Sequence, residues 1–326
     1  MRGLVVKNTG SHYRVRTDSG ALFDCKVKGN FRLRGIRSTN PVAVGDKVVF
    51  EPAKEGEPCS EHSDATGCER ILTGWITDIG DRTNYIIRKA SNLSKQSHII
   101  AANVDQCLLL VTVSHPETST VFVDRFLAVS EAYRIPVHIV INKADVYGDD
   151  ELRIASLLSS LYGQIGYSCH TVSCISGSPF PGPDSLLPIL EGRTTLLSGN
   201  SGVGKSTLLN ALLPGVRQKT APLSEAHDMG MHTTTFSEMF ELPSSGWLID
   251  TPGVKGFGTF DMEREEVGHY FREFFSLSSQ CRYGNCTHTH EPGCAVRAAL
   301  GKQLVAPSRY ASYLSMLDDK EETKYR

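Results

Sequence analysis

The stretch Gly199-Asn-Ser-Gly-Val-Gly-Lys-Ser206 decides the fold class of this chain, because it matches the pattern G-x-x-x-x-G-K-[S/T]. Glycines in this pattern allow successive backbone N–H groups to turn inward around phosphate oxygens. The apolar run Thr195–Ser198 before it predicts a buried strand, and Lys205–Leu213 after it predicts a helix. A strand, a glycine-rich loop and a helix in this order indicate an α/β nucleotide-binding domain rather than an isolated turn.

The loop assigns a role to its basic and hydroxyl side chains. Lys205 is expected to reach the β and γ phosphates, and the Ser206 hydroxyl to bind Mg²⁺. The helix N-terminus adds partial positive charge beside the phosphates. The residues expected to contact the nucleotide here are Gly199, Asn200, Ser201, Gly202, Val203, Gly204, Lys205, Ser206 and Thr207.

Apolar runs alternate with amphipathic, helix-length stretches from about residue 98 onward. This alternation predicts a parallel sheet covered on both faces. The predicted strands are Val104–Val113, Val137–Ile141, Cys169–Val172, Thr195–Ser198 and Trp247–Ile249, and further helices are predicted at Phe122–Tyr133 and Asp150–Tyr162.

The motif Asn142-Lys143-Ala144-Asp145 indicates that the bound base is guanine. It follows a predicted strand, and the carboxyl ends of parallel strands form the ligand-binding edge of such sheets. The Asp145 carboxylate can accept from both the N1–H and the 2-amino group of guanine, whereas adenine offers neither donor in that arrangement. The phosphate loop alone leaves ATPase and GTPase open, and this motif favours a GTPase. Ser173 and Cys174, at the end of another strand, are expected to support the base from its other edge.

Two segments after the phosphate loop are expected to meet the γ-phosphate and its metal ion. In Asp250-Thr-Pro-Gly253, Asp250 is placed to hold Mg²⁺ through water and the Gly253 N–H to meet the γ-phosphate. One threonine of His232-Thr-Thr-Thr235 should sense Mg²⁺; spacing leaves open which one, and Thr234 is our choice.

The motif order is rotated relative to ordinary GTPases, in which the phosphate loop comes first. A doubly wound sheet tolerates such circular permutation, because its termini can be moved to exposed loops. The Pro/Gly-rich stretch Ser176–Asp184 is expected to cover the original ends. Val254 follows Gly253 where many GTPases have a glutamine that orients the attacking water, so the intrinsic rate should be low. His232 is our candidate for positioning that water, and a binding partner could complete the site.

A cysteine–histidine cluster follows the nucleotide motifs: Cys281, Cys286, His288 and Cys294. Zn²⁺ prefers a tetrahedral sulfur and nitrogen shell, and four protein ligands imply a structural site. His290 is the alternative to His288, and three buried free cysteines are the competing interpretation. A domain of about 70 residues or fewer often requires such a cross-link.

The first 80 residues predict a small β-barrel, because short β-rich segments recur at close spacing. These segments are Leu4–Lys7, Tyr13–Thr17, Ala21–Lys28, Lys47–Glu51 and Trp75–Ile79. Residues 1–50 hold ten Lys/Arg against three Asp, which favours a polyanion partner over a solvated basic face. The candidate contacts are Phe31, Arg32, Arg34 and Arg37. Pro52–Gly74 predicts a long loop, in which Cys59 and Cys68 are expected to be loop cysteines rather than a second metal site.

The composition is that of a globular protein, with 40% hydrophobic residues and a net charge of −2. No run approaches the roughly 18 apolar residues of a membrane span, and the N-terminus does not resemble a signal peptide. We therefore expect a cytoplasmic protein without a membrane partner. The odd number of cysteines, nine, argues against a disulfide framework.

Together these motifs resemble the RsgA (YjeQ) family of small-ribosomal-subunit biogenesis GTPases over nearly the whole chain. The resemblance is carried by the basic barrel, the two nucleotide motifs, Gly230-Met-His-Thr-Thr-Thr235, Asp250-Thr-Pro-Gly253 and C-x4-C-x-H-x5-C. It implies an N-terminal OB-fold over 1–80, a circularly permuted P-loop GTPase domain over 98–258 and a mostly helical zinc-binding domain over 259–326. It also implies binding of the 30S subunit and 16S rRNA late in maturation, and GTP hydrolysis stimulated by that subunit. We expect a monomer.

The chain departs from the family pattern at two places, the long Pro52–Gly74 segment and a Ser-Cys pair at 173–174 where Ser-Ala is common. Two other functions remain open on sequence alone. One is an RNA-binding checkpoint in which nucleotide gates binding and turnover is secondary. The other is a metallochaperone, which the closed Cys₃His set disfavours because delivery requires labile ligands.

Overall fold

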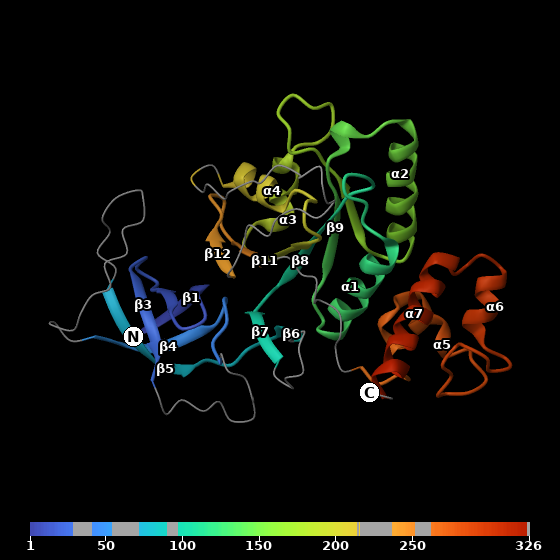
Figure 1. Cartoon of the computed structure of the whole chain (residues 1–326), viewed down its shortest axis with the longest axis horizontal. Coiled ribbons are helices and arrows are strands. Elements are labelled where there is room, and N and C mark those ends of the chain that lie inside the picture. Colours follow the sequence, from blue (N-terminus) through green and yellow to red (C-terminus); the bar gives the residue numbers. More distant parts are fainter. Residues whose placement is uncertain are drawn as a thin grey trace. The chain divides into compact units, whose positions relative to one another are not determined.

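The computed structural model describes residues 1–28, 41–53, 72–89, 97–213, 215, 237–251 and 262–324. Contacts divide the chain into two compact units (Figure 1). The first unit holds the described residues from 1 to 105, 187 to 197 and 237 to 251. The second holds those from 106 to 186, 198 to 215 and 262 to 324.

Five short strands in the first unit close into a barrel, as predicted. They are β1 (Arg2–Asn8), β2 (Tyr13–Arg16), β3 (Leu22–Val27), β4 (Lys47–Pro52) and β5 (Leu72–Ile79). The neighbour order is β1-β2-β3-β5-β4, and pairing of β1 with β4 completes the circle. Only β3 and β5 run parallel among these pairs. A closed five-stranded barrel of this kind is an OB-fold.

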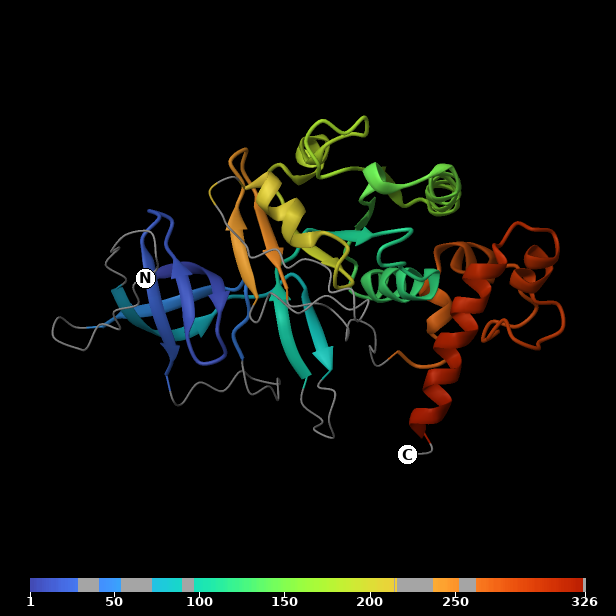
Figure 2. The ribbon, with the colours of Figure 1, turned by 45° about the horizontal axis from the view of Figure 1, so that its top comes forward.

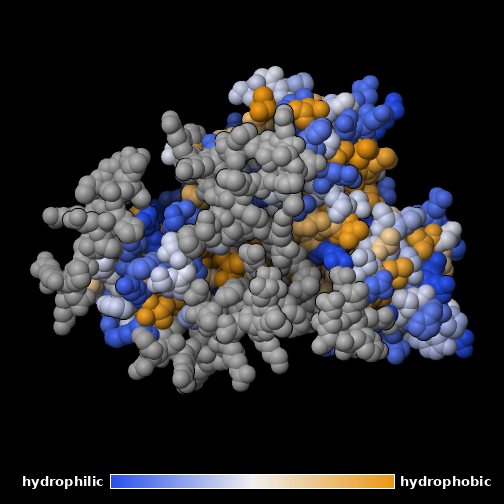
Figure 3. Space-filling view, in the orientation of Figure 1, coloured by the Kyte–Doolittle hydropathy of each residue, from blue (hydrophilic) through white to orange (hydrophobic). Residues whose placement is uncertain are grey.

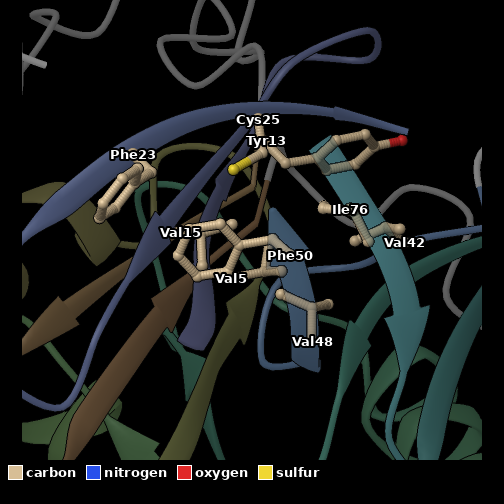
Figure 4. Packing of buried hydrophobic residues seen from close by; sticks show 9 residues of the cluster. All are labelled: Val5, Tyr13, Val15, Phe23, Cys25, Val42, Val48, Phe50 and Ile76. Atoms are coloured by element: carbon tan, nitrogen blue, oxygen red, sulfur yellow. The ribbon is translucent and has the colours of Figure 1, made fainter. Parts of the chain in front are cut away.

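The barrel closes around apolar side chains that alternate along its strands. Figure 4 shows Val5, Val15 and Phe50 together in this core, and all three are fully buried. The rings of Phe23 and Phe50 lie 4.8 Å apart in a tilted arrangement. Side chains alternate between the two faces of a strand, so a shift of one residue in strand pairing would expose these core side chains to water. Burial of the apolar side chains therefore fixes the register.

A buried ion pair ties the barrel to the residues that follow it. The Arg82 side chain donates to both carboxylate oxygens of Asp46, at 2.7 and 2.6 Å. Asp46 also accepts from the backbone N–H of Ala43 at 2.7 Å. Beyond Arg82, β6 (Tyr85–Lys89) and β7 (Ser97–Ala102) form a separate antiparallel pair, which was not among the predicted strands.

Three more strands of the first unit continue from the barrel. They are β11 (Thr194–Gly199), whose last two residues belong to the second unit, β12 (Glu238–Glu241) and β13 (Trp247–Asp250). β12 pairs antiparallel with β13, and these two orange strands lie side by side in Figure 2. β12 also pairs antiparallel with β1, and β13 pairs parallel with β11. The short helix α3 (Leu187–Leu190) precedes β11 and buries Leu190.

The second unit contains three of the predicted parallel strands with their helices, and β11 and β13 of the first unit correspond to the other two. β8 (Gln106–Val111), β9 (Val137–Ile141) and β10 (Ser168–Thr171) pair parallel in that order. Every residue of β8 is buried, as expected for a strand covered on both faces. The helices are α1 (Thr120–Ala132), α2 (Asp149–Gln164) and α4 (Lys205–Leu212), with short 3₁₀ turns η1 (Ala144–Val146) and η2 (Pro183–Leu186).

The C-terminal part of the second unit is helical, as predicted. It comprises η3 (Val267–Tyr270), α5 (Arg272–Ser278), α6 (Ala295–Gly301) and α7 (Pro307–Lys324). Arg309 of α7 is 1% exposed and donates to Asp124 of α1 at 2.8 Å and to Glu273 of α5 at 2.7 Å. Burial raises the pKa of Asp124, and the Arg309 charge opposes that effect. This buried ionic cluster therefore fixes α5 and α7 against α1.

No helix among the described residues has both the length and the apolar character needed to cross a bilayer. On the face drawn in Figure 3, hydrophobic and hydrophilic residues of the described part are interspersed. The most exposed large apolar side chains include Leu157 of α2, at 70%, and Leu304, at 73%.

Replacing Arg309 by glutamine should destabilise the helical C-terminal part strongly. The change leaves the buried Asp124 carboxylate without its charged partner, and removal of one member of a buried pair costs about 3 kcal/mol or more. Chemical denaturation monitored by circular dichroism measures the loss. Arg153→Gln is the control, because its pair with Asp150 is exposed and should contribute little. Equal stability of the two variants would contradict the role given to the buried cluster.

Candidate nucleotide site and metal cluster

The phosphate loop connects the end of β11 to the start of α4, as the sequence predicts. Gly199 and Gly204 have φ values of +143° and +98°, which L side chains rarely adopt. A Cβ on Gly199 would lie 2.4 Å from the Leu110 carbonyl oxygen, so β8 and the loop approach too closely for any other residue. The Lys205 ammonium donates to the carbonyl oxygens of Gly199 at 2.8 Å and Asn200 at 2.7 Å. Its charge is thereby held over the loop.

The Asn142–Asp145 segment contacts this loop directly. The buried Asn142 amide donates to the Val203 carbonyl oxygen at 2.9 Å. A Cβ on Gly204 would lie 2.4 Å from the same amide nitrogen, so the contact requires glycine there. Lys143 takes a left-handed φ of +64°, and its ammonium donates to the carbonyl oxygen of His115. Burial lowers the pKa of Lys143, and the nearby Asp145 carboxylate opposes that shift.

The Ser173–Cys174 pair lies on the other side of the same segment. The Ser173 hydroxyl donates to the Asp145 carboxylate at 2.6 Å. The Cys174 thiol donates to the Asn142 side-chain oxygen at 3.5 Å. Burial raises the pKa of the Cys174 thiol to about 11, so it remains protonated as a donor near neutral pH. Asp145 itself is exposed, which leaves its carboxylate accessible to a ligand.

The remaining predicted nucleotide residues divide into two groups. Asp250 ends β13 and is 2% exposed, with Thr251 beside it at 1%. His232, Thr234 and Gly253 lie outside the described residues, and the roles given to them stay predictions.

The four residues of the predicted metal cluster converge in the C-terminal part of the second unit. The ligand atoms of Cys281, Cys286, His288 and Cys294 all lie within 4.8 Å of one another. The Nδ1 atom of His288 is 3.4 Å from the Cys294 sulfur and 3.7 Å from the Cys281 sulfur. A tetrahedral zinc site with Zn–S bonds of about 2.3 Å has edges of roughly 3.7 Å, so the donor set fits that ion. His290, the alternative ligand, is exposed and bonds to Thr289 instead.

Several residues that shape the metal-binding loop carry no sequence signal. The Glu291 carboxylate accepts from the backbone N–H of Thr287 at 2.6 Å and of Thr289 at 3.0 Å. Burial alone would raise the pKa of Glu291. Hydrogen bonds from the Thr287 hydroxyl, from the Glu291 backbone and from these two N–H groups outweigh burial and lower the pKa to about 2. From α7, the hydroxyls of Tyr310 and Tyr313 donate to the carbonyl oxygens of residues 288 and 287, at 2.7 and 2.6 Å. No spacing rule identifies such partners, because they meet the loop only in the folded chain.

The fold and the motif order define a class of protein: a circularly permuted P-loop GTPase with an N-terminal OB-fold and a helical C-terminal part that carries a Cys/His cluster. The family model for the RsgA GTPase matches residues 79–260, and the model for the RsgA N-terminal domain matches residues 2–59. The chain therefore belongs to the RsgA family of GTPases.

Individual relatives agree over the full length. The small ribosomal subunit biogenesis GTPase RsgA 2 of Bacteroides thetaiotaomicron is 60% identical over 326 residues, covering 100% of this chain and 99% of that protein. A small ribosomal subunit biogenesis GTPase RsgA of Bacteroides fragilis shows the same identity and coverage. The crystal structure of YjeQ from Thermotoga maritima is similar with a TM-score of 0.72 at 32% identity, covering 98% of this chain and 97% of that one. The crystal structure of YloQ, a circularly permuted GTPase, is similar with a TM-score of 0.70 at 30% sequence identity. The match covers 100% of this chain and 96% of that one.

Purified protein should hold about one zinc ion per chain, and Cys281→Ser should lower that occupancy. Loss of a thiolate from a four-ligand site weakens binding and removes the cross-link that holds the loop. We expect the midpoint of thermal unfolding of the helical C-terminal part to fall by roughly 5–10 °C. Metal content by mass spectrometry and calorimetry measure both effects, and Cys169→Ser, outside the cluster, is the control. Equal zinc content in both variants would exclude Cys281 as a ligand.

Proposed function

We propose that this GTPase acts in late maturation of the 30S small ribosomal subunit, binds its 16S rRNA, and hydrolyses GTP faster when bound to the subunit. The observation that carries the proposal is the contact of Asn142 with Val203, which joins a guanine-type motif to a phosphate loop within a chain of this family. The names of the full-length relatives support the ribosomal role. The site of action is then the cytoplasm, where small subunits mature.

In this proposal each part of the site has one task. Asp145 accepts from the guanine base while Ser173 orients its carboxylate through the 2.6 Å hydrogen bond. The amides from Gly199 to Thr207 and the ammonium of Lys205 hold the phosphates. Bound Mg²⁺ would be held by the Ser206 hydroxyl and would neutralise charge on the β and γ phosphates. Asp250, Gly253 and Thr234 are proposed to face the γ-phosphate side.

The proposed RNA contacts follow from the charge of the N-terminal barrel. In its described part, several basic side chains already pair with acids, including Lys7 with Glu238 at 3.0 Å and Arg16 with Glu241 at 2.8 Å. Such charges are partly neutralised within the protein. The basic residues of segment 29–40 lie outside the described residues, and Phe31, Arg32, Arg34 and Arg37 stay our proposed contacts.

We propose three domains with the boundaries that the sequence suggests: 1–80 for RNA binding, 98–258 for GTP hydrolysis and 259–326 for a structural zinc ion. The donor set of three thiolates and one imidazole supports zinc over magnesium or calcium at the last site. Because all four positions are protein ligands, the ion has a structural task. We propose that the protein acts as a monomer.

Asp145→Asn should convert the base preference from guanine to xanthine. An amide nitrogen cannot accept from the N1–H of guanine, whereas it can donate to the 2-oxo group of xanthine. GDP affinity should fall about a hundredfold, as expected when a charged hydrogen-bond partner is lost, and xanthosine diphosphate should bind more tightly than GDP. Titration calorimetry measures both ligands. Asp149→Asn, exposed at the start of α2, is the control and should keep the wild-type preference.

Purified 30S subunits should raise the rate of GTP hydrolysis at least about tenfold, since the chain has Val254 where many GTPases carry the glutamine that orients water. Phosphate release measured with 30S subunits, with 50S subunits and without either tests the partner. A rate unaffected by 30S subunits would contradict the ribosomal proposal.

His232→Ala should lower turnover without changing nucleotide affinity. Unchanged hydrolysis in His232→Ala would remove that residue from the mechanism.

A further inference from the structure

One side chain outside the nucleotide motifs binds the backbone of the guanine-type loop. Tyr147 follows the turn η1 and is 8% exposed. Its hydroxyl accepts from the backbone N–H of Val113 at 2.9 Å. The same hydroxyl donates to the carbonyl oxygen of Asn142 at 2.5 Å. Tyr147 thus connects the residues that follow β8 to the residue that follows β9.

The hydroxyl takes the place of one backbone hydrogen bond between the chain segments that continue these two strands. In a parallel ladder, one residue donates to the neighbouring strand at one position and accepts from that strand two residues further on. The Asn142 N–H donates to the Val111 carbonyl oxygen at 2.9 Å, so its own carbonyl should accept from Val113. The Tyr147 hydroxyl lies between these two groups instead. β8 and β9 are therefore held apart at the edge where the guanine-type loop begins.

This separation sets the position of the Asn142–Asp145 loop. The side chain of Asn142 is bound to the phosphate loop through Val203, and its backbone is bound through Tyr147. Three residues beyond Asn142, the Asp145 carboxylate is oriented by Ser173. Burial raises the pKa of Tyr147, which keeps its hydroxyl protonated and able both to donate and to accept.

We propose that Tyr147 is a positioning residue for base specificity. Its hydroxyl holds the backbone of Asn142 at the spacing at which the Asp145 carboxylate meets both the N1–H and the 2-amino group of guanine. The inference rests on the proposed function, because it requires Asp145 to read the base.

The test compares GDP with inosine diphosphate, which lacks the 2-amino group, in wild-type protein and in Tyr147→Phe. Without the hydroxyl, the Val113 N–H and the Asn142 carbonyl oxygen lose their shared partner. If they then hydrogen-bond to each other directly, the Asn142–Asp145 loop moves toward β8. The Kd for GDP should rise about tenfold. The Kd for inosine diphosphate should rise less, so the preference for GDP should fall.

Tyr167→Phe is the matched control. Tyr167 is also buried, and its hydroxyl hydrogen-bonds to Glu131 at 3.1 Å, away from the nucleotide motifs. The Tyr167→Phe variant should be less stable than wild type but should keep the wild-type preference for GDP over inosine diphosphate. The ratio of two dissociation constants from one preparation does not depend on the fraction of folded protein, so partial unfolding of Tyr147→Phe does not obscure the result.

Two outcomes distinguish failure of the role of Tyr147 from failure of the proposed guanine recognition by Asp145. A wild-type preference for GDP that Tyr147→Phe retains in full would overturn the role of Tyr147 alone. A wild-type protein that binds ADP as tightly as GDP would overturn the proposed reading of guanine by Asp145, and the inference with it.

Discussion

The contact between Asn142 and Val203 is the constraint on which the proposed site depends. It joins two loops that lie 61 residues apart in the chain, in an order opposite to that of ordinary GTPases. The bond is buried, so an Asn142 amide without its partner would carry a full desolvation cost. It also requires Gly204, since a Cβ there would lie 2.4 Å from the amide nitrogen. Circular permutation leaves this contact intact because it changes the connections between strands and preserves the edge at which the strands end.

Much of the fold could be predicted because it follows from local demands on the backbone. The glycines of the phosphate loop occupy positive φ values that few other residues adopt. The buried strands β8 and β9 show as near-continuous apolar runs, and the barrel strands as short alternating ones. β12 carries no strand signal in the sequence, because Glu238–Glu241 has only four residues and two of them are acidic. Its pairing with β1 and β13, rather than its own composition, makes it a strand.

The sequence could not reveal the partners that support each loop. Arg309 and Asp124 are charged residues in helices, and such residues are expected to face water. They are buried because α7 meets α1, a contact between residues 185 positions apart. Tyr147 looks like an ordinary core tyrosine until its hydroxyl is seen between Val113 and Asn142. These residues act through single hydrogen bonds across the fold, and no period or spacing encodes such bonds.

Helix α7 joins the metal cluster to the helices beside the parallel strands. Within one turn it presents Arg309 to Asp124 of α1 and Tyr310 to the carbonyl oxygen of His288. Tyr313, one turn later, holds the neighbouring carbonyl of Thr287. The backbone hydrogen bonds of the helix fix the spacing of these three side chains along it. The same helix therefore contacts both the metal-binding loop and the buried ionic cluster at α1 within the second unit.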